Sequence, residues 1–224
     1  MKNWIRWALW MGICLIGAGC AQRAPVIVAS AEQQAQARER FAQRALDDWT
    51  AMEIRLARVT HQVAVGAASL CRDTEPAFAL WVQDIGGLPY RLRGEVRDTF
   101  ASSPSARAFP LDARALGMRD DERIVAIGGV RLDGTGSKQA LDEALGGSRV
   151  TLRVRADVGV ERDLVADAQR RCTGLVVVDA RSDPWAAYRG WRIEVSAGFL
   201  NLLDDDALAF VVAHELGHRH LGHL

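Results

Sequence analysis

The sequence feature that most constrains the fold is the segment AFVVAHELGHRHLGHL at residues 209–224 of the 224-residue chain. Residues 207–213 are almost entirely apolar, which is typical of a helix that lies inside a protein. His214 and His218 are one helical turn apart, so both imidazoles can face one point, and Ala207 and Val211 share their stripe. Buried imidazoles are costly unless they are hydrogen-bonded or bind a metal, and we therefore expect a metal site.

The residue types in this motif suit hydrolysis at zinc. Imidazole nitrogens bind zinc at about 2.0–2.1 Å. Glu215 can take a proton from a water at the metal and pass it to a leaving amine. We therefore predict Zn2+ as the cofactor, His214 and His218 as ligands and Glu215 as the general base. The alternative is an accidental match on a core helix whose histidines are satisfied by hydrogen bonds. Acidic residues at 204–206 predict the start of this helix.

The first twenty residues predict an export signal. Lys2 and Arg6 precede a short apolar stretch that cannot span the roughly 30 Å bilayer core. The stretch GAGC resembles a bacterial lipoprotein processing site, which implies that residues 1–20 are a signal peptide and that Cys20 is lipidated. By the same resemblance, Ala21 favours an outer-membrane lipoprotein that faces the periplasm over one in the inner membrane. A plain signal peptide with a secreted product and a single membrane anchor are the alternatives.

Two of the remaining cysteines can form a disulfide in an oxidising compartment. Cys14 leaves with the signal, and Cys71 and Cys172 remain as a pair. A bridge would close a loop of about 100 residues and stabilise the fold by roughly 4–5 kcal/mol in the chain-entropy model. Two buried thiols are the alternative. The net charge is zero and no basic stripe is present, so we expect no nucleic-acid partner.

A tether and a long helix are predicted over residues 21–76. Ser30 begins the helix, with Gln33 placed for a capping box. The helix is expected to continue to Cys71, and we interpret His61 within it as a packing or surface residue rather than a ligand. Its apolar face recurs at three- and four-residue steps and comprises Phe41, Ala45, Trp49, Met52, Leu56 and Val59.

Residues 77–168 form a β-rich segment. Strands are expected over 77–84, 95–100, 149–157 and 161–167, and a short helix over 137–145. In the third of these strands, Val150, Leu152 and Val154 share one face.

Residues 115–157 resemble the second half of a PDZ domain. Gly117-Met118, the following turn and the run from Ile124 to Gly129 carry this resemblance, although Asp121-Glu122 stand where Gly-Asp is usual. It implies a PDZ-like domain over 77–168 that binds extended peptides by strand addition, with a carboxylate-binding loop near Gly86-Gly87. The alternative is a β-rich spacer that binds nothing.

Residues 183–223 resemble the HtpX/Oma-like zinc metallopeptidases, which are gluzincins related to the CAAX prenyl proteases. Trp185 stands where the family has asparagine, which puts substrate contacts from that position in doubt. The positions that match, besides the motif at 214–218, are Gly190, Ile193, Val195, Gly198, Phe199, Leu200 and His223.

This resemblance implies an α+β fold with the first part of a zincin-type domain at 169–224. In the family the third zinc ligand is a glutamate on a later helix, so we expect a chain cut off just after the motif. On a continued helix His220 and His223 lie on other faces than His214 and are poor substitutes.

The predicted function is that of a zinc-dependent metalloendopeptidase acting on misfolded envelope proteins from a lipid anchor on Cys20. The long helix is expected to pack on the catalytic core, which makes the PDZ-like segment an insertion between Cys71 and Cys172. The alternative is a non-catalytic, PDZ-containing, peptide-binding lipoprotein with a protease remnant.

Overall fold

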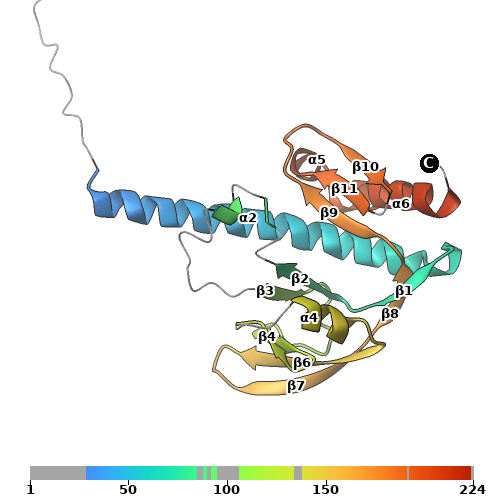
Figure 1. Cartoon of the computed structure of the whole chain (residues 1–224), viewed down its shortest axis with the longest axis horizontal. Coiled ribbons are helices and arrows are strands. Elements are labelled where there is room, and N and C mark those ends of the chain that lie inside the picture. Colours follow the sequence, from blue (N-terminus) through green and yellow to red (C-terminus); the bar gives the residue numbers. More distant parts are fainter. Residues whose placement is uncertain are drawn as a thin grey trace, which may run out of the picture. The chain divides into compact units, whose positions relative to one another are not determined.

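The computed structural model describes residues 29–84, 88–89, 92–94, 106–133, 138–190 and 192–222 (Figure 1). The signal peptide with Cys20, Gly86-Gly87, the strand expected at 95–100 and His223 lie outside the described residues. The elements are α2 (Ala31–Gly66), the 3-10 helix η1 (Ala68–Leu70), β1 (Thr74–Ala77), β2 (Leu80–Asp84), β3 (Ala106–Pro110), β4 (Glu122–Ile127), β5 (Val130–Arg131), α4 (Lys138–Leu145), β6 (Arg149–Ala156), β7 (Glu161–Asp167), β8 (Gln169–Cys172), β9 (Leu175–Asp179), β10 (Ala186–Arg189), β11 (Arg192–Ser196), α5 (Ala197–Leu202) and α6 (Asp205–Leu221).

The chain divides into two compact units, residues 1–37 and 38–224. In the first unit, α2 begins with the predicted capping box. The Gln33 backbone N–H donates to Ser30 Oγ at 3.2 Å, and the Ser30 N–H donates to Gln33 Oε1 at 2.9 Å. Two backbone donors of the first turn are thereby satisfied, and this prediction is confirmed.

Within the second unit, α2 buries one stripe whose N-terminal end differs from the predicted one. Trp49, Leu56 and Val59 are buried as expected, but Ala42 is buried in place of Phe41, which is 61% exposed. The helix also ends at Gly66 rather than at Cys71, and η1 follows. Glycine is a weak helix former, which favours an end at this position.

The β-rich segment folds around a core of its own, built from residues 78–168. A four-stranded antiparallel sheet in the order β5-β4-β6-β7 and a two-stranded antiparallel sheet of β2 and β3 supply its strands. Val150, Leu152 and Val154 on β6 point into this core, as the alternation predicts. The β4–β5 turn requires glycine, because Gly128 and Gly129 have φ values of 56° and 81° and a side chain on Gly128 would meet Ala144 Cβ at 2.6 Å.

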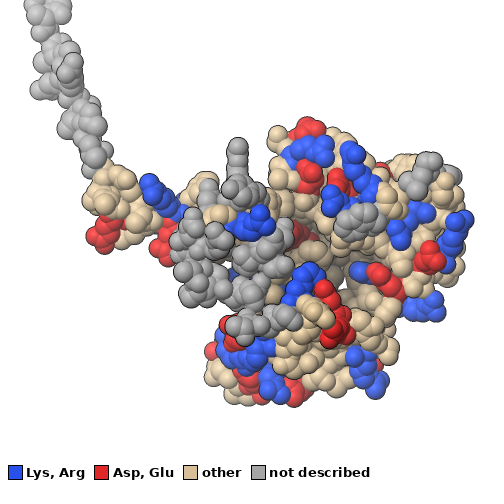
Figure 2. Space-filling view, viewed as in Figure 1, with Lys and Arg blue, Asp and Glu red and all other residues tan. Residues whose placement is uncertain are grey.

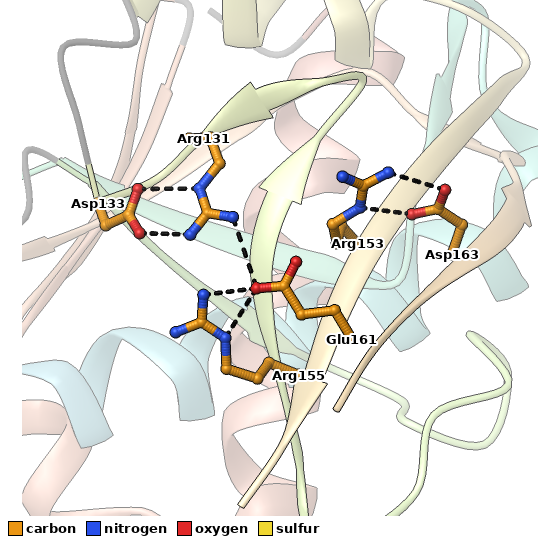
Figure 3. Close-up of polar contacts among 6 residues, drawn as sticks. All are labelled: Arg131, Asp133, Arg153, Arg155, Glu161 and Asp163. Atoms are coloured by element: carbon orange, nitrogen blue, oxygen red, sulfur yellow. Dashed lines mark hydrogen bonds and ion pairs between the residues drawn. The ribbon is translucent and has the colours of Figure 1, made fainter. Parts of the chain in front are cut away.

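The outer face of this sheet carries a ladder of paired charges (Figure 3). Arg153 on β6 lies opposite Asp163 on β7 and donates to it at 2.8 and 3.0 Å. Arg155 donates to Glu161 at 2.8 Å in the same way. The alternation of β6 thus places apolar side chains inside and arginines outside, where each arginine meets an acidic residue of β7.

A second core joins two segments that are far apart in the sequence. It combines the C-terminal half of α2 with β9, β11, α5 and α6. β1 and β8 pair antiparallel where the chain leaves the α2 segment and returns to it, near the C-terminal end of α2 (Figure 1). Cys71 and Cys172 form a disulfide beside this pair, with Cα atoms 5.6 Å apart and a sequence separation of 101.

Positive and negative side chains are interspersed on the face of the molecule in Figure 2. The chain has 28 basic and 28 acidic residues, so its formal net charge is also zero. In the part of the chain that the structure describes, no helix combines the length and apolarity that a membrane span needs.

Candidate metal and catalytic site on helix α6

Helix α6 has well-defined ends. The Asp204 side chain caps the first turn by accepting from the Ala207 N–H at 2.8 Å, so the predicted start is confirmed. Gly222 ends the helix in the left-handed region with φ 73°. The Arg55 guanidinium on α2 donates to Asp205 and lowers the pKa of that carboxyl. The same guanidinium donates to the backbone carbonyl of Leu203 at 2.5 Å, which fixes the corner before α6 onto α2.

The prediction that α6 is buried on nearly every side is wrong. Only the stripe of Leu208, Val212 and Leu216 is buried among its described residues. Phe210 is 73% exposed and His214 is also exposed. An apolar sequence shows that a helix tolerates burial on any face, whereas the elements packed against it decide which face is covered. The motif stripe therefore lies beside the core rather than in it.

His214 and His218 meet on the open side of α6. Their Nε2 atoms are 3.1 Å apart, and their rings are perpendicular with centroids 4.7 Å apart. Two nitrogens that bind one zinc at about 2.0–2.1 Å in tetrahedral geometry lie roughly 3.3 Å from each other. The spacing of the two imidazoles thus fits a shared zinc ion, and their exposure leaves room for further ligands.

Glu215 lies against the sheet edge next to the two histidines. The backbone N–H of Tyr188 on β10 donates to Glu215 Oε2 at 2.7 Å. β10 is an edge strand of the sheet β10-β11-β9, and it packs on α6. Sequence reasoning missed β10, because AAYR has no apolar alternation. One carboxylate oxygen of Glu215 is therefore held by the backbone of a strand.

The loop before β10 is fixed by β11 and the start of α5. Ser196 Oγ accepts from the Trp185 N–H at 3.0 Å and donates to the Asp183 carbonyl at 2.7 Å. A side chain at Gly198 would meet the Ser182 carbonyl oxygen at 1.8 Å, so only glycine lets this loop approach α5. Gly198 therefore lets the loop before β10 lie close to α5, which places β10 where its Tyr188 N–H reaches Glu215.

The other two described histidines, neither of which was predicted as a ligand, lie elsewhere. His220 faces the core beside the disulfide, away from the pair formed by His214 and His218. His61 is buried in α2 and pairs through Nε2 with Gln169 at 2.9 Å, in agreement with its interpretation as a packing residue. Burial lowers the pKa of His61. Among the described residues, no third histidine, cysteine, aspartate or glutamate forms a compact group with His214 and His218.

A comparison of the chain with protein families gives one result. Residues 160–224 match the sequence model of peptidase family M48. The match runs from β7 through α6, so it includes β10, β11 and the helix with both histidines. It supports a zinc metallopeptidase family for this part of the chain. No curated protein and no solved structure matches the chain.

Proposed function

We propose that this protein is a zinc-dependent metalloendopeptidase whose site is formed by His214, Glu215 and His218. The observation that carries the proposal is the 3.1 Å separation of the two Nε2 atoms on the open side of α6. The peptidase family M48 match over the same residues supports it. A helix whose histidines were satisfied within a core, the alternative for this motif, would not place both rings at one accessible point.

Each residue has a distinct task in this proposal. His214 and His218 would hold a zinc ion, which would supply Lewis-acid polarisation of the scissile carbonyl and of a water. Glu215 holds the proton that moves from that water to the leaving amine. The Tyr188 N–H fixes Glu215 Oε2 by its hydrogen bond. Oε1 is then the oxygen that takes and releases the proton.

Substrates are proposed to bind as extended peptides along β10. Among the described residues β10 pairs only with β11, so apart from the Tyr188 N–H, which donates to Glu215, its other edge offers its backbone groups to a peptide. The Trp185 ring directly before β10 lies under the guanidinium of Arg181 at 3.9 Å, and an indole lacks the side-chain amide with which asparagine could bind a peptide backbone.

The cellular setting is part of the proposal. The export signal and Cys20 imply a lipid-anchored protein of the cell envelope that faces the periplasm, with misfolded envelope proteins as substrates. The disulfide between Cys71 and Cys172 suits such an oxidising compartment. The alternative remains a non-catalytic lipoprotein that binds peptides through the β-rich segment.

The test combines zinc analysis of the purified chain with casein cleavage. Glu215→Gln is expected to keep the zinc and to lower the cleavage rate by about 10²- to 10⁴-fold, because it removes the proton acceptor. Glu143→Gln, the same change on the exposed side of α4, is the matched control and is expected to change neither. A chain without zinc and without Glu215-dependent cleavage would reject the peptidase and leave the peptide-binding alternative.

A further inference from the structure

A histidine occupies the core-facing stripe of α6. Leu208, Val212 and Leu216 recur every four residues and are at most 4% exposed. His220 is the next position at this spacing, so its ring turns toward the core rather than toward His214 and His218. Its Nε2 atom is buried and has no hydrogen-bond partner among the described residues.

Packing alone gives no reason for an imidazole at this place. A buried nitrogen without a partner gives up its hydrogen bonds to water and destabilises the fold, and a leucine would continue the apolar stripe without that loss. The neighbours of His220 are the two disulfide sulfurs. The ligand atoms of Cys71, Cys172 and His220 all lie within 4.8 Å of one another.

We propose that Cys71, Cys172 and His220 bind a zinc ion when the disulfide is reduced. Two thiolates and one imidazole provide three of the four positions of a tetrahedral zinc site. Disulfide sulfurs are not zinc ligands, because zinc binds the thiolate. The disulfide and the zinc site are therefore alternative states of the same three residues.

The reduction balances with a dithiol as the co-reactant. One thiolate of the dithiol attacks the Cys71 sulfur, which is the more exposed of the pair, and the S–S bond breaks. The second thiolate releases Cys71 from the mixed disulfide, so the dithiol leaves oxidised and Cys71 and Cys172 receive two electrons and two protons. Zinc binding then displaces both protons from the thiols.

The zinc site would hold the same elements as the disulfide and one more. Cys71 follows η1, Cys172 ends β8, and His220 belongs to the last turn of α6. The disulfide joins the first two elements alone. In the reduced chain, before the disulfide forms, a metal at this point would add a direct bond to the helix that carries His214 and His218.

The test uses Co2+ as the probe, because thiolate ligands give cobalt an intense near-ultraviolet charge-transfer absorption that imidazole ligands lack. The metal-free full chain is titrated before and after reduction by a phosphine, which breaks the disulfide without offering a thiolate. We expect this absorption only in the reduced chain. His220→Ala is expected to weaken the binding that produces it by at least about tenfold.

His214→Ala is the control that separates this site from the proposed catalytic one, and it is expected to leave the absorption and its midpoint unchanged. A reduced chain without the absorption would overturn the proposal, and so would a His220→Ala variant with the midpoint of the parent chain. If reduction unfolds the chain, circular dichroism during the titration must show refolding by cobalt in the parent chain but not in His220→Ala. Failure to refold also overturns the proposal.

Discussion

Two cores of the second unit are built in different ways. The core of the β-rich segment comes from one continuous stretch, residues 78–168. The core beneath the candidate site joins α2 to β9, β11, α5 and α6, whose closest sequence separations exceed one hundred residues. The polar contacts follow the same division, because Arg153 pairs with Asp163 on the neighbouring strand whereas Arg55 reaches across to Asp205. The geometry of the site thus depends on residues that no local sequence window contains.

A pair of matched core variants tests this division most strongly. Leu208 on α6 and Leu152 on β6 are both fully buried. Leu208→Ala and Leu152→Ala are each expected to lower the free energy of unfolding by about 2–5 kcal/mol, because each leaves a cavity. Urea unfolding measures this effect. Zinc affinity at His214 and His218 is expected to fall in Leu208→Ala and to stay unchanged in Leu152→Ala.

Phe210→Ala is the control on the opposite side of α6. Phe210 is largely exposed, so its truncation is expected to change the free energy of unfolding by no more than about 0.5 kcal/mol. If Leu152→Ala reduced zinc affinity as much as Leu208→Ala does, the two regions would not be separable units.

Arg55 provides the next test, because it fixes α5 and α6 onto α2. Its guanidinium donates to Asp205 at 2.6 Å and to the Leu200 carbonyl at 2.6 Å, besides Leu203. Arg55→Met keeps much of the apolar stem but loses these bonds, and we expect a loss of about 2 kcal/mol in the free energy of unfolding. Arg58→Met is the matched control, since Arg58 is more exposed and makes a single 3.2 Å contact with Asp205. Thermal or urea unfolding measures both variants. If Arg55→Met and Arg58→Met lost equal free energy of unfolding, the carbonyl contacts of Arg55 would contribute nothing to stability.

Local sequence patterns correctly predicted those features that depend only on residues within the same strand or helix. The alternation of β6 located its inner face, and Ser30 and Asp204 located two helix starts, because capping depends on residues within one turn. The helical spacing of His214 and His218 was also sufficient to bring their rings together, since this geometry belongs to the helix alone. The motif at 214–218 is therefore the part of the site that the sequence alone can predict.

The features of the fold and of the site that local patterns did not predict depend on tertiary contacts. The exposed side of α6 was wrongly expected to be buried, because its composition does not identify the elements that cover the helix. β8 and β10 were missed, since QRRC and AAYR become strands only by pairing with β1 and β11. The hydrogen bond from Tyr188 to Glu215 followed from that pairing and had no sequence signal of its own.

The partly buried ion pair of the β-rich segment gives a pH test that is confined to that region. Arg162 donates to both carboxylate oxygens of Glu122 at 2.6 and 2.7 Å, and with the Arg119 N–H it lowers the pKa of Glu122 to about 2. A carboxyl whose pKa is depressed on folding stabilises above its unfolded value of 4.5 and loses that contribution as the pH falls toward about 2. Glu122→Gln is therefore expected to be less stable than the parent chain near neutral pH, with a difference that shrinks across this range. Urea midpoints of both proteins at several pH values measure it, and a difference that does not vary with pH would refute the assignment.

The exposed ladder gives the smallest expected effect. Arg153 and Asp163 are each about half exposed, so water and salt screen their attraction even though Arg153 lowers the pKa of Asp163. Arg153→Ala is expected to shift the urea midpoint slightly at low salt and not measurably at high salt. Asp163→Ala and the double variant complete a cycle that isolates the pair from other effects of each truncation. A loss as large as that of Leu152→Ala would mean that cross-strand charge pairing stabilises this sheet as much as the apolar face of β6 does.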